Sequence, residues 1–329
     1  MRKIIPALVV LSLMLASFTA GMQYQRGDVN HDGNVSITDV TCLIDYLMSG
    51  VWPEDTIPGD TIPYDTIPHD TIPVDTIPVD TVPPVPQNKT FTVNGVSFTM
   101  IAVQGGTFTM GATPEQGKDA EEKEKPAHDV TLSDYYISET LVTQELWEAV
   151  MEGDNPSYYH DPKRPVESVS WNDCQTFIAR LSLMVGQLFH LPTEAQWEYA
   201  ARGGIYSLGY KYAGSNTIGD VAWYTVNAFD VGQSNPNYGT HVVATKMPNE
   251  LGIYDMSGNV YEWCSDWSSS TYYSESPAEN PKGPSSGIKR IVRGGCWFSS
   301  DKTCRVSART EAAPSSTAGG STRGFRITL

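Results

Sequence analysis

The stretch Pro248-Asn-Glu-Leu-Gly-Ile-Tyr-Asp-Met-Ser-Gly-Asn-Val-Tyr-Glu-Trp-Cys-Ser-Asp-Trp267 decides the fold of this chain of 329 residues. It combines tryptophan, glycine and paired polar residues at a density that chance seldom produces. Three shorter strings follow it: Arg293-Gly-Gly-Cys-Trp297, Cys304-Arg305 and Gly324-Phe-Arg326. Glycine and short polar side chains mark turns and loops, so this part of the chain predicts ordered loops between short regular elements.

The composition is that of a globular protein with an acidic surface. Charged residues make up 18% of the chain, apolar residues 40%, and the formal net charge is −16. Nucleic-acid binding requires a basic patch that neutralises phosphates, so this balance argues against a nucleic-acid partner. Acidity alone names no other partner, because a solvated acidic surface gives the same composition.

The N-terminus has the three parts of a signal peptide. Basic Arg2 and Lys3 precede an apolar run over 4–15, and small residues fill 16–21. The apolar run is too short to span a bilayer, so we expect cleavage near Gly21. No cysteine lies at that position, which argues against a lipid anchor. We expect an exported protein, secreted, periplasmic or at the cell surface, with no transmembrane segment after signal removal.

Residues 22–53 contain the pattern of a calcium-binding loop followed by a helix. A hard cation needs several oxygen ligands from one loop, and Gly33 stands where such a loop turns sharply. The alternative is a solvated acidic turn without metal. The segment resembles one repeat of a type I dockerin, a family in which two repeats bind a cohesin, so the resemblance implies a cohesin-like partner and a link to polysaccharide breakdown. The predicted ligands are Asp28, Asn30, Asp32, Asn34, Ser36 and Asp39.

Residues 54–88 read as an extended linker built on the repeat Asp-Thr-Ile-Pro-x. A proline at every fifth residue forbids a helix or a central strand. At ~3.1 Å per residue the repeat would span roughly 90 Å as a polyproline-like spacer. Asp-Thr-Ile also resembles the acceptor of a bacterial O-glycosylation system, and an unmodified repeat is the alternative. The acceptors would be Thr56, Thr61, Thr66, Thr71, Thr76 and Thr81.

Residues 89–329 are long enough to bury a core of their own. Strands over 91–93 and 96–101 flank Asn94-Gly95, a strong hairpin signal. Capping residues predict three short helices. These helices would cover 144–151 after Thr143, 171–183 after Ser170, and 194–202 after Thr193.

Several strings in this domain resemble the formylglycine-generating enzyme family, also called the sulfatase-modifying factor family. They are Gly105-Gly-Thr-Phe-Thr-Met-Gly111, the segments 165–173 and 191–204, and the C-terminal block 248–326, all in family order. The resemblance implies an α+β, C-type-lectin-like fold with little regular secondary structure. It also implies an oxidase that converts a sulfatase cysteine to formylglycine with oxygen and a Cu(I) ion held by two cysteines.

The sequence departs from the family at the copper site. The enzymes carry cysteines four and nine residues after the second glycine of the Gly-Gly pair, here Gly295. Those positions are Ser299 and Cys304. Soft thiolates select Cu(I), and a serine oxygen does not. Cys296, which directly follows Gly295, offers an alternative pair with Cys304, so Cys296 and Cys304 are the candidate catalytic residues.

The resemblance implies two further features of the C-terminal block. One is a disulfide between Cys264 and Cys304, which would leave no thiolate at the copper position. The other is a calcium site, formed by the carboxylates of Asp255 and Glu262 and the carbonyls of Gly258 and Val260. In the alternative to calcium, the carboxylates cap loops by accepting backbone N–H groups. The late arginines Arg293, Arg305, Arg309 and Arg326 are expected to pair with buried carboxylates.

Two functions remain open from the sequence. In the first, the domain is a non-catalytic binding or assembly module that presents a loop over 296–322 to a protein or glycan. In the second, it is a copper-dependent oxidase. The histidines do not decide between them, since they are scattered without metal-site spacing.

Overall fold

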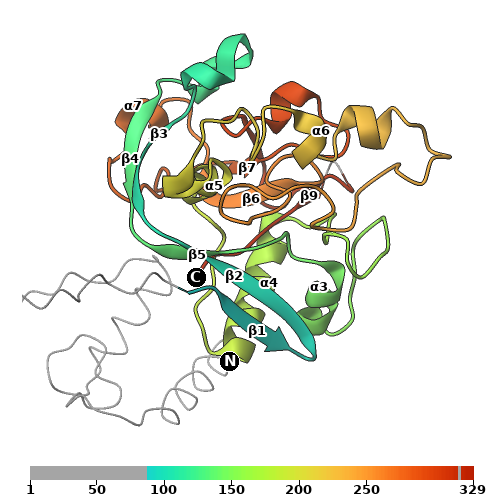
Figure 1. The fold of residues 1–329 in the computed structure, drawn as a ribbon. Coiled ribbons are helices and arrows are strands. Elements are labelled where there is room, and N and C mark those ends of the chain that lie inside the picture. The colour runs from blue at the N-terminus through green and yellow to red at the C-terminus, as the bar shows by residue number, and fades with distance from the viewer. Residues whose placement is uncertain (1–86, 318–319) are drawn as a thin grey trace, which may run out of the picture. The chain divides into compact units, whose positions relative to one another are not determined.

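The computed structural model describes residues 87–317 and 320–329, which form a mixed helix-and-sheet domain (Figure 1). The strands are β1 (Lys89–Val93), β2 (Val96–Val103), β3 (Gly106–Met110), β4 (His128–Leu132), β5 (Tyr135–Ser138), β6 (Tyr261–Trp267), β7 (Arg290–Arg293), β8 (Arg309–Ala312) and β9 (Arg323–Gly324). The α-helices are α3 (Gln144–Met151), α4 (Trp171–Val185), α5 (Glu194–Ala201), α6 (Ile218–Val221) and α7 (Tyr272–Glu275). The expected α+β class with short elements and long ordered loops is confirmed.

The predicted hairpin is present as β1 and β2. Asn94 and Gly95 have φ angles of 48° and 85°, the left-handed values that a tight two-residue turn requires. β2 also pairs antiparallel with β5, which completes a sheet in the order β1-β2-β5. A separate two-stranded sheet, β3-β4, follows in the chain.

The three predicted helices are also confirmed, and their first turns show why. The Thr143 hydroxyl accepts the N–H of Leu146 at the start of α3. Ser170 and Thr193 form reciprocal capping boxes at the starts of α4 and α5. α4 continues to Val185, two residues beyond the prediction, where Gly186 closes it in a left-handed conformation.

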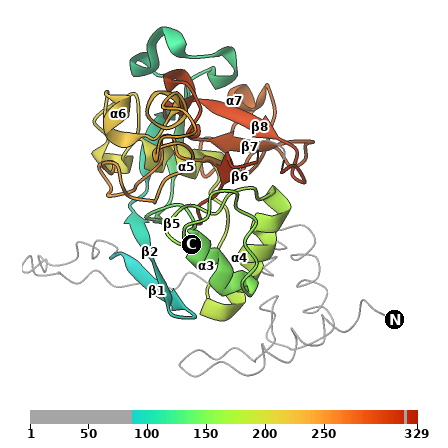
Figure 2. The same ribbon diagram turned by 90° about the vertical axis from the view of Figure 1, so that its right-hand side faces the viewer.

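The third sheet carries the C-terminal block, in the order β8-β7-β6-β9. β7 pairs antiparallel with β6 and β8, whereas β9 pairs parallel with β6. In Figure 2 this sheet lies with α5 and α6 in the upper part of the domain, and β1, β2, α3 and α4 lie in the lower part. Strands from residues 261 to 324 thus converge around β6.

Two large clusters of buried apolar side chains form the core. The first joins α5 to β3, β4 and β6, with Trp197 and Tyr199 at its centre. The second joins α3 and α4 to β1, β2 and the chain end. There Trp147 stacks on Phe177 at 5.2 Å between ring centroids. Their burial removes the largest apolar surfaces from water, so these rings contribute much of the stability.

The predicted signal peptide, the dockerin-like calcium loop and the Asp-Thr-Ile-Pro linker all lie outside the described residues. In the part of the chain that the structure describes, no helix combines the length and the apolar character needed to cross a membrane.

Candidate functional site

The Gly294-Gly295 turn brings the end of β7 against Cys304. Both glycines have left-handed φ angles, 89° and 76°. A β-carbon at Gly295 would lie only 2.6 Å from the Cys304 sulfur. The absence of a side chain therefore allows the Cys296 segment to pass directly over Cys304.

Ser299, which stands at the position of the missing copper cysteine, turns back toward Cys296. Its hydroxyl accepts the Cys296 N–H at 3.0 Å and lies 3.3 Å from the Cys296 sulfur. It also donates a hydrogen bond to the Tyr261 hydroxyl at 3.1 Å. Cys296 is fully buried and Ser299 nearly so, whereas Tyr261 is only partly buried.

Burial keeps the sulfur atoms of this cluster protonated at neutral pH. It raises the pKa of Cys296 to about 11, and the hydrogen bond with Ser299 offsets part of the rise. Burial also raises the pKa of Cys304, and the neighbouring Cys296 adds to it. The structure thus brings the two candidate catalytic thiols together, but in a setting that disfavours the thiolate.

The predicted disulfide between Cys264 and Cys304 is not formed. Both thiols are free and buried, as are those of Cys174 and Cys296. Cys264 packs in the first core cluster, whereas Cys304 packs beside Tyr212 in a separate one. Cys296 instead lies close enough to Cys304 to raise its pKa. These two residues are the alternative pair of candidate copper ligands named from the sequence.

The residues of the predicted calcium site lie close together, in a buried region. Asp255 accepts the Ala244 N–H at 2.8 Å and the Asn259 side-chain amide at 3.3 Å. Glu262 accepts two N–H groups of Arg326, at 2.6 and 3.1 Å. Arg326 therefore neutralises Glu262, while Asp255 makes no ion pair in the ranges that the structure describes.

This set fits a calcium ion in part. Burial raises the pKa of Asp255, and the hydrogen bonds from Ala244 and Asn259 and the charge of Arg326 offset part of the rise. Glu262 would have to share its oxygens between Arg326 and a metal ion. Within residues 87–317 and 320–329, no group of three or more His, Cys, Asp and Glu side chains is arranged to hold a metal.

The late arginines pair with buried carboxylates, as predicted. Each of the four contacts a different glutamate, three of which lie far away in the sequence on α5 or in the segment before β4. The pairs are Arg293 with Glu198, Arg305 with Glu124, Arg309 with Glu194 and Arg326 with Glu262. All eight side chains are almost fully buried, so their role is to hold the loops together rather than to meet a substrate.

A cluster of aromatic rings lies above Cys296, and we call it the aromatic surface. Trp297 is its centre, with ring centroids between 5.1 and 5.7 Å from those of its four neighbours. Trp297 itself is buried, but Tyr158, Phe298 and Phe229 are 73%, 48% and 41% exposed. The surface consists of Tyr158, Tyr159, Phe229, Tyr238, Trp297 and Phe298.

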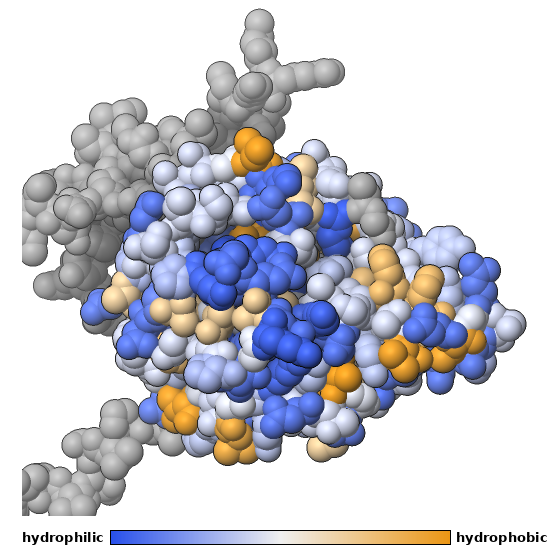
Figure 3. All heavy atoms as spheres, turned by 90° about the horizontal axis from the view of Figure 1, so that it is seen from above, coloured by the Kyte–Doolittle hydropathy of each residue, from blue (hydrophilic) through white to orange (hydrophobic). Residues whose placement is uncertain are grey.

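The aromatic surface joins three loops that are far apart in the sequence. Figure 3 shows apolar residues gathered toward the right-hand end of the face, the end where the segment between α6 and β6 projects in Figure 1. The sequence contains the adjacent aromatic pairs Tyr158-Tyr159 and Trp297-Phe298, and these pairs are the sequence signal that could have predicted the aromatic surface. Of the predicted ligand loop over 296–322, only its first residues belong to this surface, since β8 lies in the sheet.

The C-terminal domain is similar to proteins of one known family. Residues 86–329 match the family model described as the sulfatase-modifying factor enzyme 1-like domain. A protein named chaperone protein LppX from Paenibacillus barcinonensis is 34% identical over 255 residues, which cover 64% of this chain and 83% of that protein. The formylglycine-generating enzyme of Streptomyces coelicolor is 31% identical over 285 residues, with 69% of this chain and 87% of the enzyme covered.

A solved structure shares this fold. Treponema denticola variable protein 1 superposes with a TM-score of 0.64 at 33% sequence identity, over 74% of this chain and 99% of that protein. The relatives thus include proteins named as enzymes and proteins named otherwise.

Proposed function

This chain belongs to the sulfatase-modifying factor family, and from that premise we propose that its C-terminal domain is a non-catalytic binding module. The observation that carries the proposal is the aromatic surface, whose central ring, Trp297, packs in one buried cluster with Cys296 while its outer rings are exposed. The ligand would be a protein or a glycan that covers these rings. The chemistry of Cys296, Ser299 and Cys304 argues against the oxidase.

The altered copper position lacks the donors that a Cu(I) ion needs. Ser299 offers a hydroxyl oxygen, and that hydroxyl is already engaged with Cys296 and Tyr261. Thiols become metal ligands as thiolates, and burial opposes their ionisation here.

The aromatic surface has the composition of a binding interface. Aromatic residues are enriched where proteins bind ligands, and a buried ring surrounded by exposed ones is typical of an energetic hot spot. Trp297 occupies such a central position, and its indole N–H already donates to the Ser321 carbonyl at 2.9 Å. The rings are therefore held in place before a ligand arrives, which lowers the entropy cost of binding.

A copper-dependent oxidase is the second candidate, because Cys296 and Cys304 are neighbours. In that case the two thiolates would hold a Cu(I) ion, which would supply oxygen chemistry. Cys296 and Cys304 would be its protein ligands, and Ser299 the polar side chain beside Cys296. This alternative requires the loop over 296–304 to open and the buried thiols to ionise.

We also propose a calcium ion at Asp255, with the carbonyls of Gly258 and Val260 and one oxygen of Glu262 as further ligands. The support is the buried Asp255 carboxylate without an ion pair, in a segment that a metal would order. Adding CaCl2 after chelation should raise the unfolding temperature of the full chain. Loss of that increase in Asp255→Asn, but not in Asp129→Asn, supports the site; an equal increase in both variants rejects it.

The N-terminal segments extend the same proposal. Residues 1–21 would direct export to the periplasm, the cell surface or the medium, and 22–53 would bind calcium and recruit a cohesin-like partner. The linker 54–88, with or without glycans, would hold the binding domain away from that partner.

The binding proposal is tested with arrays of glycans and of extracellular peptides. The full chain should bind at least one array member saturably, and Phe229→Ala/Phe298→Ala should weaken that binding roughly tenfold or more. Leu183 and Leu188 are more exposed than these two phenylalanines and lie outside the aromatic surface, so Leu183→Ala/Leu188→Ala is the control. No saturable binding, or equal binding by both double variants, would reject the aromatic surface.

A further inference from the structure

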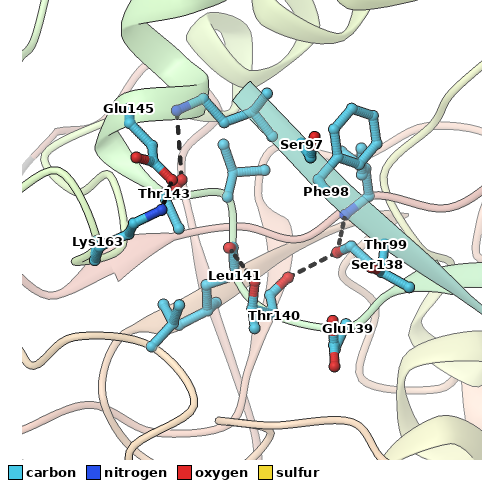
Figure 4. A pocket seen from close by; sticks show the side chains of 14 residues that line it. Ser97, Phe98, Thr99, Ser138, Glu139, Thr140, Leu141, Thr143, Glu145 and Lys163 are labelled. Carbon is cyan, nitrogen blue, oxygen red and sulfur yellow. Dashed lines mark hydrogen bonds and ion pairs between the residues drawn. The ribbon is translucent and has the colours of Figure 1, made fainter. Parts of the chain in front are cut away.

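A second candidate site lies between β2 and the first turn of α3, apart from the aromatic surface. It is a cavity of about 180 Å³. Its wall is formed by β2, the segment that follows β5 and the start of α3, together with Lys163 and Val243 from two loops. Figure 4 shows Glu145 and Lys163 on one side of the cavity, Glu139 on another and Thr140 with Leu141 between them. No residue of the aromatic surface lines it.

The charges of the wall favour a ligand without net negative charge. Lys163 donates to Glu145 at 2.5 Å, and this pair is internally neutral. Glu139 forms no ion pair and no side-chain hydrogen bond in the described part of the chain, so the wall keeps one unpaired carboxylate. An anion would be repelled by this carboxylate.

The polar groups of the wall require a ligand that both donates and accepts hydrogen bonds. The Glu139 carboxylate and the Thr99 hydroxyl offer acceptors, whereas the Ser97 hydroxyl is already hydrogen-bonded to Thr92 at 2.8 Å. The main-chain N–H groups of Thr140 and Leu141 donate no hydrogen bond among the described residues and offer donors. An apolar ligand would leave these groups unpaired, at a cost in binding free energy. Leu141 and Val243 add an apolar side to the same wall.

The size of the cavity limits the ligand to one ring. Sites for drug-sized molecules measure roughly 300–1,000 Å³, so about 180 Å³ suits a smaller compound. A sugar ring combines hydroxyls, which donate and accept, with an apolar face of C–H groups. We propose that the β2–α3 cavity binds a neutral monosaccharide unit, with Glu139 and Thr99 as hydrogen-bond partners of its hydroxyls.

The test uses the full chain and saturation-transfer NMR with glucose, galactose, mannose and N-acetylglucosamine as probes, followed by titration of each sugar that binds. A ligand of this size should have a dissociation constant on the order of 1 mM. Glu139→Gln removes the charged acceptor and should weaken binding roughly tenfold. Thr99→Val removes a hydroxyl at constant shape and should weaken binding as well.

Glu275→Gln is the matched control, because it makes the same change on an exposed side chain outside the cavity. Unfolding temperatures close to that of the unmodified chain show that each variant is folded. The proposal holds if a sugar binds saturably and only the cavity variants weaken it. The proposal is overturned if no sugar binds at a concentration of roughly 50 mM, which is 50-fold above the expected dissociation constant. It is also overturned if the cavity variants bind the sugar as tightly as the control does, or if glycine or phosphate displaces the sugar.

Discussion

The Ser299 hydroxyl oxygen lies 3.3 Å from the Cys296 sulfur, so the residue at the position where the sequence predicts the loss of a copper ligand is a hydrogen-bond partner of Cys296. The same hydroxyl joins Cys296 to Tyr261. The position thus holds the loop beneath the aromatic surface in one conformation. Ser299, at the predicted copper position, thus makes the hydrogen bonds of a structural residue.

Gly295→Ala should destabilise the domain, because its β-carbon would lie 2.6 Å from the Cys304 sulfur at a φ of 76°. Strain and overpacking together predict a loss of about 2–4 kcal/mol in the free energy of unfolding, measured with urea. Gly209→Ala is the control, since Gly209 has a φ of 69° but no atom within 4 Å of its β-carbon position. Equal losses in the two variants would show that Cys304 is not packed against the turn.

Glu198→Gln should cost about 3 kcal/mol in unfolding free energy, because it removes the carboxylate that neutralises the fully buried Arg293. Arg202 loses the same partner. The exposed pair of Lys289 and Glu311 supplies the comparison, and Glu311→Gln should cost less than about 1 kcal/mol. If Glu198→Gln is as mild as Glu311→Gln, the buried arginines do not hold the loops as described.

Because of Asp266, the free energy of unfolding of the domain should decrease as the pH rises from about 4 to 7. Burial, together with the charge of Glu194, raises the pKa of Asp266 from 3.8 to about 7. The folded domain therefore holds a proton that the unfolded chain releases, and this stabilisation, complete below the unfolded pKa, is lost as the pH rises through the folded one.

The measurement compares urea unfolding of the unmodified chain and Asp266→Asn at several pH values. The difference in unfolding free energy between them should change by up to about 1.4 kcal/mol per pH unit within this window, in favour of Asp266→Asn at higher pH. A difference that stays constant from pH 4 to 7 would contradict a protonated Asp266.

Local signals in the sequence predicted much of the fold. Thr143, Ser170 and Thr193 marked the starts of α3, α4 and α5, because a capping hydroxyl acts within one helical turn. Asn94-Gly95 fixed the first hairpin for the same reason. The parallel pairing of β6 with β9 left no such signal, since it depends on how the intervening residues 268–322 are folded.

The candidate site was predictable only in part. The family pattern located Ser299 and the late arginines, but not the neighbour that each side chain contacts. The predicted pairing of Cys264 with Cys304 was wrong, since both thiols are free. The Cys304 sulfur instead packs against the main chain of Gly295. The aromatic surface required three loops to meet, and ring contacts between distant loops have no period in the sequence.

The central claim is tested most directly by anaerobic Cu(I) titration of the reduced full chain against a competing chelator, with Cys304→Ser and Ser299→Cys as comparisons. The account predicts no one-to-one complex for the unmodified chain and a gain of Cu(I) affinity in Ser299→Cys, because that change restores a thiol at the family position. Ser300→Cys, which adds an exposed thiol one residue away, should show no gain. A one-to-one complex of the unmodified chain that Cys304→Ser abolishes would contradict the binding-module account and favour the oxidase.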